Sequence, residues 1–149
     1  MSKLKVYKKP EPPPDPEVVA AQEFAMTLPV EKYADMERDV VWGYENGKPE
    51  DIHIENELFT LDITKLGDCC DADVKLKVRG QEANIEDFGN WADIDEKHAP
   101  EWGCGNMYFT IWLAEDAILK KYGINRAEYY IIGMVLEKYL WIGCCDQCG

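Results

Sequence analysis

Residues 52–64 read IHIENELFTLDIT, and apolar side chains alternate with polar ones on either side of Asn56. A period of two is typical of β-strands that bury one face. The two runs differ in phase by one residue, so a turn or bulge near Asn56 and Glu57 is needed to keep both apolar sets on one side. His53 falls on the outward phase, so we expect it to be exposed rather than catalytic. The inward set is Ile52, Ile54, Phe59, Leu61 and Ile63.

Two further stretches predict strands. Val74, Leu76 and Val78 alternate with basic residues and indicate a third half-buried strand. Residues 107–113, MYFTIWL, are rich in aromatic and branched side chains, which favours a more central strand. Together the strands predict an antiparallel sheet of three to five strands.

Helices are expected on both sides of these strands. Asp15 before Pro16 is a good helix start, and the helix should run to about Met26. Pro29 interrupts it, and a second short helix is expected from Val30 to about Arg38. Residues 43–51 carry Asn-Gly and a proline and predict a loop.

The C-terminal third predicts a helical hairpin. A helix over residues 114–121 should stop at Gly123, and Asn125 with Glu128 forms a capping box for the last helix. That helix should run to about Trp141. Its apolar stripe is Tyr129, Ile132, Val135, Leu136 and Tyr139. The fold class is therefore α+β: N-terminal helices, a central antiparallel sheet and a C-terminal helical hairpin.

The first residues differ in composition from the rest. Residues 1–16 contain five prolines and four lysines, so they predict a disordered basic, proline-rich tail ahead of a single acidic domain over residues 17–149. We interpret the tail as a solvated spacer. The alternative is a proline-rich peptide ligand.

Charge limits the partners. The 149-residue chain has 16 Lys and Arg against 29 Asp and Glu, a net charge of −13. Residues 1–9 carry +4, so residues 10–149, with 12 basic and 29 acidic residues, carry −17. Such a body repels phosphate backbones and is attracted to basic surfaces. We expect no direct nucleic-acid binding, no membrane span and a cytoplasmic protein.

Six cysteines lie in three segments flanked by Gly or Asp. They are Cys69, Cys70, Cys104, Cys144, Cys145 and Cys148. Cys145 and Cys148 have the CxxC spacing of half a zinc knuckle, and the following Gly149 permits the left-handed backbone such a turn needs. Cys104 and either Cys69 or Cys70 would complete a four-thiolate site, with His98 as a substitute for one of them. We therefore predict a structural zinc site.

Two alternatives stay open for the thiols. They are reduced structural cysteines, or disulfide and redox chemistry. Vicinal cysteines bridge one another only with strain, and the CxxC pair follows a helix C-terminus, where the dipole raises thiol pKa values. Neither feature favours the second alternative.

The sequence favours a non-enzymatic binding protein. Glycine-rich phosphate loops, nucleophile elbows and zinc-protease helices are all missing from it. The hypothesis is an acidic α+β protein with a structural zinc site that docks on a basic protein surface. It includes an inhibitor that mimics nucleic-acid charge on a nucleic-acid-binding protein. The competing hypothesis is a small metal- or thiol-dependent enzyme.

Overall fold

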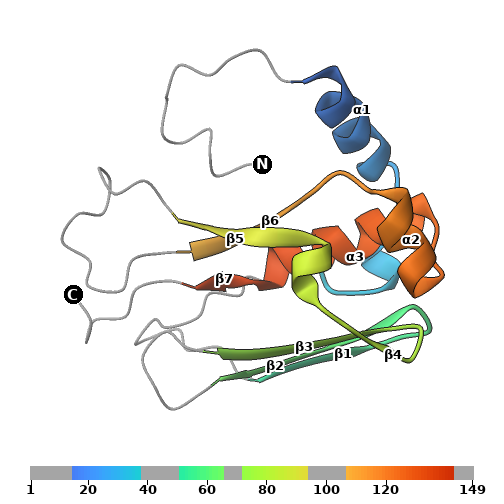
Figure 1. Ribbon diagram of the computed structural model, residues 1–149. Helices are drawn as coiled ribbons and strands as arrows, with labels where there is room; N and C mark the ends of the chain where they lie inside the picture. The colour runs from blue at the N-terminus through green and yellow to red at the C-terminus, as the bar shows by residue number, and fades with distance from the viewer. Residues whose placement is uncertain (1–14, 38–50, 66–71, 94–106, 143–149) are drawn as a thin grey trace.

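The structure is a computed structural model that describes residues 15–37, 51–65, 72–93 and 107–142. Within these residues the strands form two antiparallel sheets, one ordered β1-β2-β3-β4 and the other β5-β6-β7. Figure 1 shows helix α3 beside the three-stranded sheet, with the four-stranded sheet below both and helix α1 above. The α+β class and the C-terminal pair of helices are as predicted.

Helix α1 (Pro16–Ala25) begins and ends as its sequence predicts. The Asp15 carboxylate accepts a hydrogen bond from the Glu17 amide at 2.8 Å, and the helix buries Ala21 and Ala25. The helix expected after Pro29 is only the 3₁₀ turn η2 (Val30–Lys32), followed by bends as far as residue 37. Its first residue has no side-chain cap, and a 3₁₀ turn rarely extends beyond a few residues. Arg38 and nearly all of the predicted 43–51 loop lie outside the described residues.

The four-stranded sheet contains the sequence alternation that predicted it. Its strands are β1 (Ile52–Glu55), β2 (Phe59–Lys65), β3 (Ala72–Val78) and β4 (Gln81–Ala83). Leu61 pairs with Ile54 on one side and Leu76 on the other, which places the apolar phases on one face. The predicted turn is built by Asn56, whose side-chain oxygen accepts the amides of Leu58 and Phe59, both at 2.8 Å.

The second sheet contains β5 (Gly89–Asp93), β6 (Met107–Ile111) and β7 (Trp141–Ile142). The strand predicted over 107–113 is indeed a central one, but it is the middle strand of this separate sheet and does not join the first. The last helix ends at Tyr139, two residues earlier than expected. Leu140 leaves the helical conformation, and its carbonyl accepts the Phe109 amide at 3.0 Å. Residues 141 and 142, where the helix was expected to end, instead form β7 and pair with the edge of β6 that β5 does not cover.

Helices α2 (Asp116–Tyr122) and α3 (Arg126–Tyr139) form the predicted hairpin. Gly123 closes α2 at φ 66°, a left-handed conformation that glycine adopts without strain. The capping box of Asn125 and Glu128 is confirmed, with hydrogen bonds of 2.8 and 2.9 Å. Every member of the predicted apolar stripe of α3 is buried.

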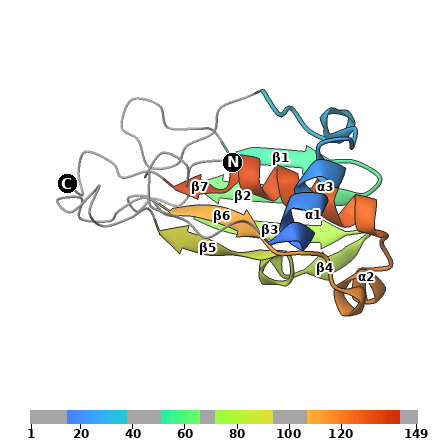
Figure 2. The same ribbon diagram turned by 90° about the horizontal axis from the view of Figure 1, so that it is seen from above.

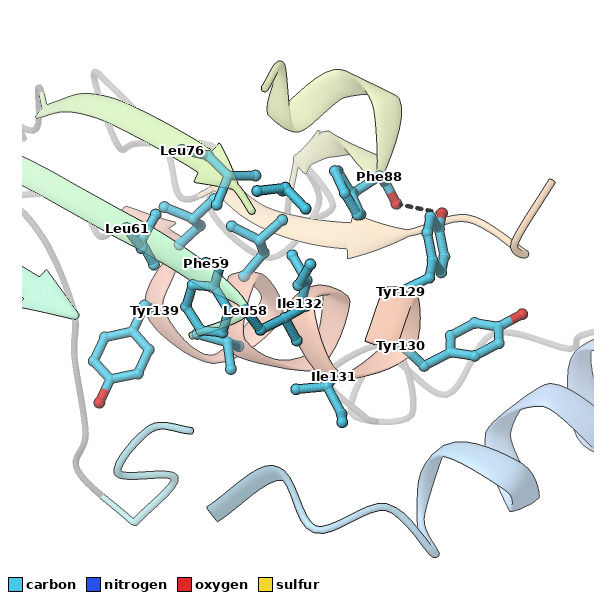
Figure 3. Close-up of a cluster of buried hydrophobic side chains, with 14 of the residues drawn as sticks. Leu58, Phe59, Leu61, Leu76, Phe88, Tyr129, Tyr130, Ile131, Ile132 and Tyr139 are labelled. Carbon is cyan, nitrogen blue, oxygen red and sulfur yellow. Dashed lines mark hydrogen bonds between the residues drawn. The ribbon is translucent and has the colours of Figure 1, made fainter. Parts of the chain in front are cut away.

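Helix α3 is the centre of the core, and eight of its 14 residues are buried. Figure 3 shows Ile132 beside Leu58, which immediately precedes β2, and near Phe59 of β2 in the four-stranded sheet. On the opposite side the Arg126 guanidinium lies 4.8 Å from the ring centre of Phe24 in α1. An apolar helix buried on several sides needs partners on each of them, and the two sheets with α1 supply these.

Gly133 of α3 marks the closest approach of the helix to β6. A Cβ placed there would lie 2.9 Å from both Cδ1 and Cγ2 of Ile111. Such a distance is well inside van der Waals contact, and Ile111 is packed against the core and cannot simply move away. Glycine at this position therefore permits helix–sheet packing at the expense of helix propensity.

We expect Gly133→Ala to lower the free energy of unfolding by about 1–3 kcal/mol, although alanine favours helix. Urea denaturation followed by circular dichroism measures this. In the Ile111→Ala background, which removes the opposing methyl groups, the same substitution should cost much less. Equal losses in both backgrounds would show that the contact with Ile111 is unimportant.

Candidate functional site

The described strands that lead into the cysteine segments all stop at one end of the molecule. In the three-stranded sheet, Met107 pairs with both Asp93 and Ile142; Met107 is the first residue of β6, and the other two are the last residues of β5 and β7. In the other sheet, Lys65 pairs with Ala72 at the end of β2 and β3. Figures 1 and 2 place both sets of strand ends on the same side. This end of the molecule is where residues 66–71, 94–106 and 143–149 join the described chain.

The predicted zinc ligands lie outside the described residues. This applies to Cys69, Cys70, Cys104, Cys145 and Cys148, and also to the substitute His98. Over the part of the chain that the structure describes, no three His, Cys, Asp or Glu side chains gather in a way that could hold a metal ion. The zinc site therefore stays a prediction. The positions of the strand ends limit where the cysteine segments can begin.

His53 lies on the exposed outer face of the four-stranded sheet, as predicted. Its Nδ1 contacts the Asp62 carboxylate, the cross-strand partner of His53, and its Nε2 lies 3.2 Å from Glu55. Hydrogen bonds to Asp62 and then Glu55 raise the pKa of the imidazole above its usual value. Both ring nitrogens face carboxylates, an arrangement that suits a charged imidazolium better than a general base.

Asp87 connects the 3₁₀ turn η3 (Ile85–Asp87) to helix α2. Its carboxylate accepts hydrogen bonds from the Tyr122 hydroxyl and from Lys121 Nζ, the latter at 2.8 Å. Burial opposes its ionisation, but these two hydrogen bonds outweigh burial and hold the pKa of Asp87 below its usual value. Tyr122 is buried and stacks on Phe88 with ring centres 5.7 Å apart. We interpret Asp87, Lys121 and Tyr122 as structural, because their hydrogen bonds hold α2 against η3, which connects β4 to β5.

The most acidic described stretch is residues 15–37, which form α1 and η2. Six exposed carboxylates and one lysine give it a charge of −5; they are Asp15, Glu17, Glu23, Glu31, Asp35, Glu37 and Lys32. By contrast, Arg79 and Lys121 elsewhere are paired with Glu128 and Asp87. Arg126 of α3 is a cation beside this stretch, with its guanidinium 4.8 Å from the ring centre of Phe24.

Several interactions of the described surface were not predicted from sequence. The partners of His53 follow from the β1–β2 register, which fixes Asp62 opposite it, and the turn at Asn56 contains the signal for that register. The ion pair of Arg79 with Glu128 had no such signal, because 49 residues separate its members. Strands β4 and β5 were also missed: β4 has only three residues, and β5, GNWAD, has no β-branched residue and no apolar alternation.

Comparison with known proteins identifies no relative. No family model, curated protein or solved structure matches this chain. No helix in the described parts of the chain has the length and apolar character needed to cross a membrane.

We expect Asp62→Asn to lower the pKa of His53 toward its usual value of 6.5, because the largest cause of the upward shift is removed. The measurement is an NMR titration of the imidazole Hε1 signal, which is simple with two histidines in the chain. Asp73→Asn, on the outer face of the same sheet, is the matched control and should leave the titration unchanged. A histidine whose pKa is the same in all three proteins would contradict the proposed contacts.

The pH dependence of stability follows from the sign of this shift. A pKa that is higher in the folded than in the unfolded protein stabilises the fold below the unfolded value, near 6.5, as long as the carboxylates stay ionised. This contribution is lost as the pH rises through the folded pKa. Wild type should thus exceed His53→Gln in urea midpoint at pH 5.5 by more than at pH 8.5.

Proposed function

We propose that the protein is a non-enzymatic binding domain with a structural zinc site, which docks through its acidic surface on a basic protein partner. A specific form of this function is inhibition of a nucleic-acid-binding protein by charge mimicry. The observation that carries the zinc site is the common end of the strands that lead to all three cysteine segments.

Chain connectivity supports the convergence of the thiols. Met107 and Ile142 are paired residues, Cys104 precedes the first by three residues, and Cys145 follows the second by three. A residue spans at most about 3.6 Å, so each cysteine backbone stays within about 11 Å of this strand pair. Continued for three residues, the same antiparallel register would set Cys104 opposite Cys145.

The four-stranded sheet can supply the remaining ligand. Cys69 and Cys70 belong to the six-residue connection between Lys65 and Ala72, which are themselves paired. A site made of Cys104, Cys145, Cys148 and one of these two would therefore join the ends of two sheets that are otherwise separate. Metal-binding free energy would then contribute directly to folding, because the unfolded chain has no preformed site.

We expect protein purified without added zinc to hold about one zinc ion per chain, measured by inductively coupled plasma mass spectrometry. Chelation should unfold it, and Cys148→Ser should remove the metal and destabilise the fold. Cys144→Ser is the matched control, since it changes a neighbouring thiol outside the proposed ligand set. Metal-free protein with six freely titrating thiols would overturn the site, while a Cys148→Ser protein that keeps its stability but loses zinc would indicate a catalytic site.

The docking proposal is supported by charge. Residues 15–37 carry −5, and all six of their carboxylates are exposed. A basic surface that normally holds a nucleic-acid backbone would be attracted to this face, and the attraction should be screened by salt.

Binding of a fluorescent oligo-arginine peptide should weaken at least roughly tenfold between low and physiological ionic strength, measured by anisotropy. Neutralising Glu17, Glu23 and Glu31 together to Gln should weaken binding several-fold at low salt. The matched control neutralises Glu57, Glu82 and Glu86, which are exposed elsewhere and change the net charge equally. Equal losses in both variants would assign binding to net charge alone, and salt-insensitive binding would contradict charge mimicry.

A further inference from the structure

Trp112 is an exposed aromatic side chain that the fold holds in place. Of the large apolar side chains in the described residues, it and Met26 are the ones that are exposed, Trp112 at 46%. Its amide donates to the Phe88 carbonyl at 2.9 Å, and its own carbonyl accepts from the Tyr129 hydroxyl at 2.9 Å. Its indole N–H donates to Asn90 at 3.2 Å. An aromatic ring fixed in this way loses little conformational entropy when a ligand covers it.

The surroundings of Trp112 indicate what kind of ligand would fit. Thr110 pairs with Asn90 and lies two residues before Trp112, so all three lie on the side of β5 and β6 opposite to the buried Phe109. Exposed carboxylates follow at Glu115 and Asp116. An indole face next to carboxylates suits a segment that carries both prolines and lysines, because proline packs on aromatic rings and lysine pairs with the acids or with the ring.

We infer that the occupant of this face is the chain's own basic, proline-rich segment, residues 3–14. Its sequence KLKVYKKPEPPP contains four lysines, four prolines and one acid. A polyproline II conformation is already populated by such a segment when it is free, which lowers the entropy lost on docking. In this proposal the segment is a proline-rich ligand, the alternative given above for residues 1–16, and its binding surface lies on the same molecule.

Helix α1, which follows the basic segment in the chain, lies on the side of the molecule where β6 is linked to α2. Phe24 of α1 contacts Tyr130 with ring centres 6.1 Å apart, and the Tyr130 hydroxyl accepts the Ala114 amide, two residues after Trp112, at 3.0 Å. Figure 2, seen from above, shows the first turn of α1 over the chain that links β6 to α2. Pro10 lies five residues before Asp15, which corresponds to about 16 Å of polyproline II chain. The short tether also gives the segment a high effective concentration at this face.

This inference rests on the proposed function in one respect. Docked near Glu115 and Asp116, the lysines of the segment would neutralise these two carboxylates, which are separate from the acidic stretch of residues 15–37, and would lower the net negative charge that attracts a basic partner. The segment would thus weaken partner binding from the Trp112 face without occupying the acidic stretch itself.

The test is NMR spectroscopy on the full-length protein without a partner. The indole signal of Trp112 is assigned by its loss in Trp112→Phe. We expect nuclear Overhauser contacts from the Trp112 ring to proline Hδ protons, and a shifted indole signal when Pro12, Pro13 and Pro14 are replaced together by Ser. The indole of Trp91, which packs on Phe109 toward the other face of the sheet, is the internal control and should not shift.

Two results would overturn the inference. One is an unchanged Trp112 signal in the triple variant together with no contacts to proline. The other is contacts seen only between molecules in a mixture of labelled and unlabelled protein, which would make the occupant a second copy. Zinc content and oligo-arginine binding are measured separately, so failure of this docking is distinguishable from failure of the proposed function.

Discussion

Burial of helix α3 is the constraint on which the other described elements depend. Eight of its 14 residues are buried, and three of these are tyrosines, whose hydroxyls need hydrogen-bond partners away from water. Each finds one on a different segment. Tyr129 reaches the Phe88 and Trp112 carbonyls, Tyr130 accepts the Ala114 amide, and Tyr139 donates to the Asp35 carbonyl at 2.7 Å. The helix therefore positions the β5 and β6 ends, the start of α2 and the η2 region with directional bonds as well as apolar contact.

Side-chain hydrogen bonds and ion pairs join several of the described elements at one end of the molecule. Where the β3–β4 turn meets the start of α3, Arg79 and Glu128 link sheet to helix, and Asp87 with Lys121 and Tyr122 links η3 to α2. At the opposite end the strands of both sheets stop together, and the three cysteine-bearing segments leave from there. A metal site at that end would add a cross-link between the two sheets.

Charge and aromatic exposure act together in the two proposals. An acidic surface attracts any basic partner and discriminates weakly, because screened charge–charge attraction has little directionality. A fixed indole such as that of Trp112 adds shape and orientation. The basic segment at the start of the chain has both chemistries, which makes it the simplest model for what an external partner would need to present.

Local sequence was sufficient for the elements whose signals are local. Asn56, the alternation around it and the capping box of Asn125 with Glu128 each depend on neighbours within a few residues, and each was predicted correctly. The division of the strands into two sheets could not be predicted in this way, because β6 pairs with β5 and β7, and β7 follows α3. The end of α3 was likewise decided by the Phe109 amide, which takes the Leu140 carbonyl. Cysteine spacing suggested one metal site, but the common end of the strands emerged only once two sheets and a buried helix were packed in space, since pairing between distant segments is set by the core that they share.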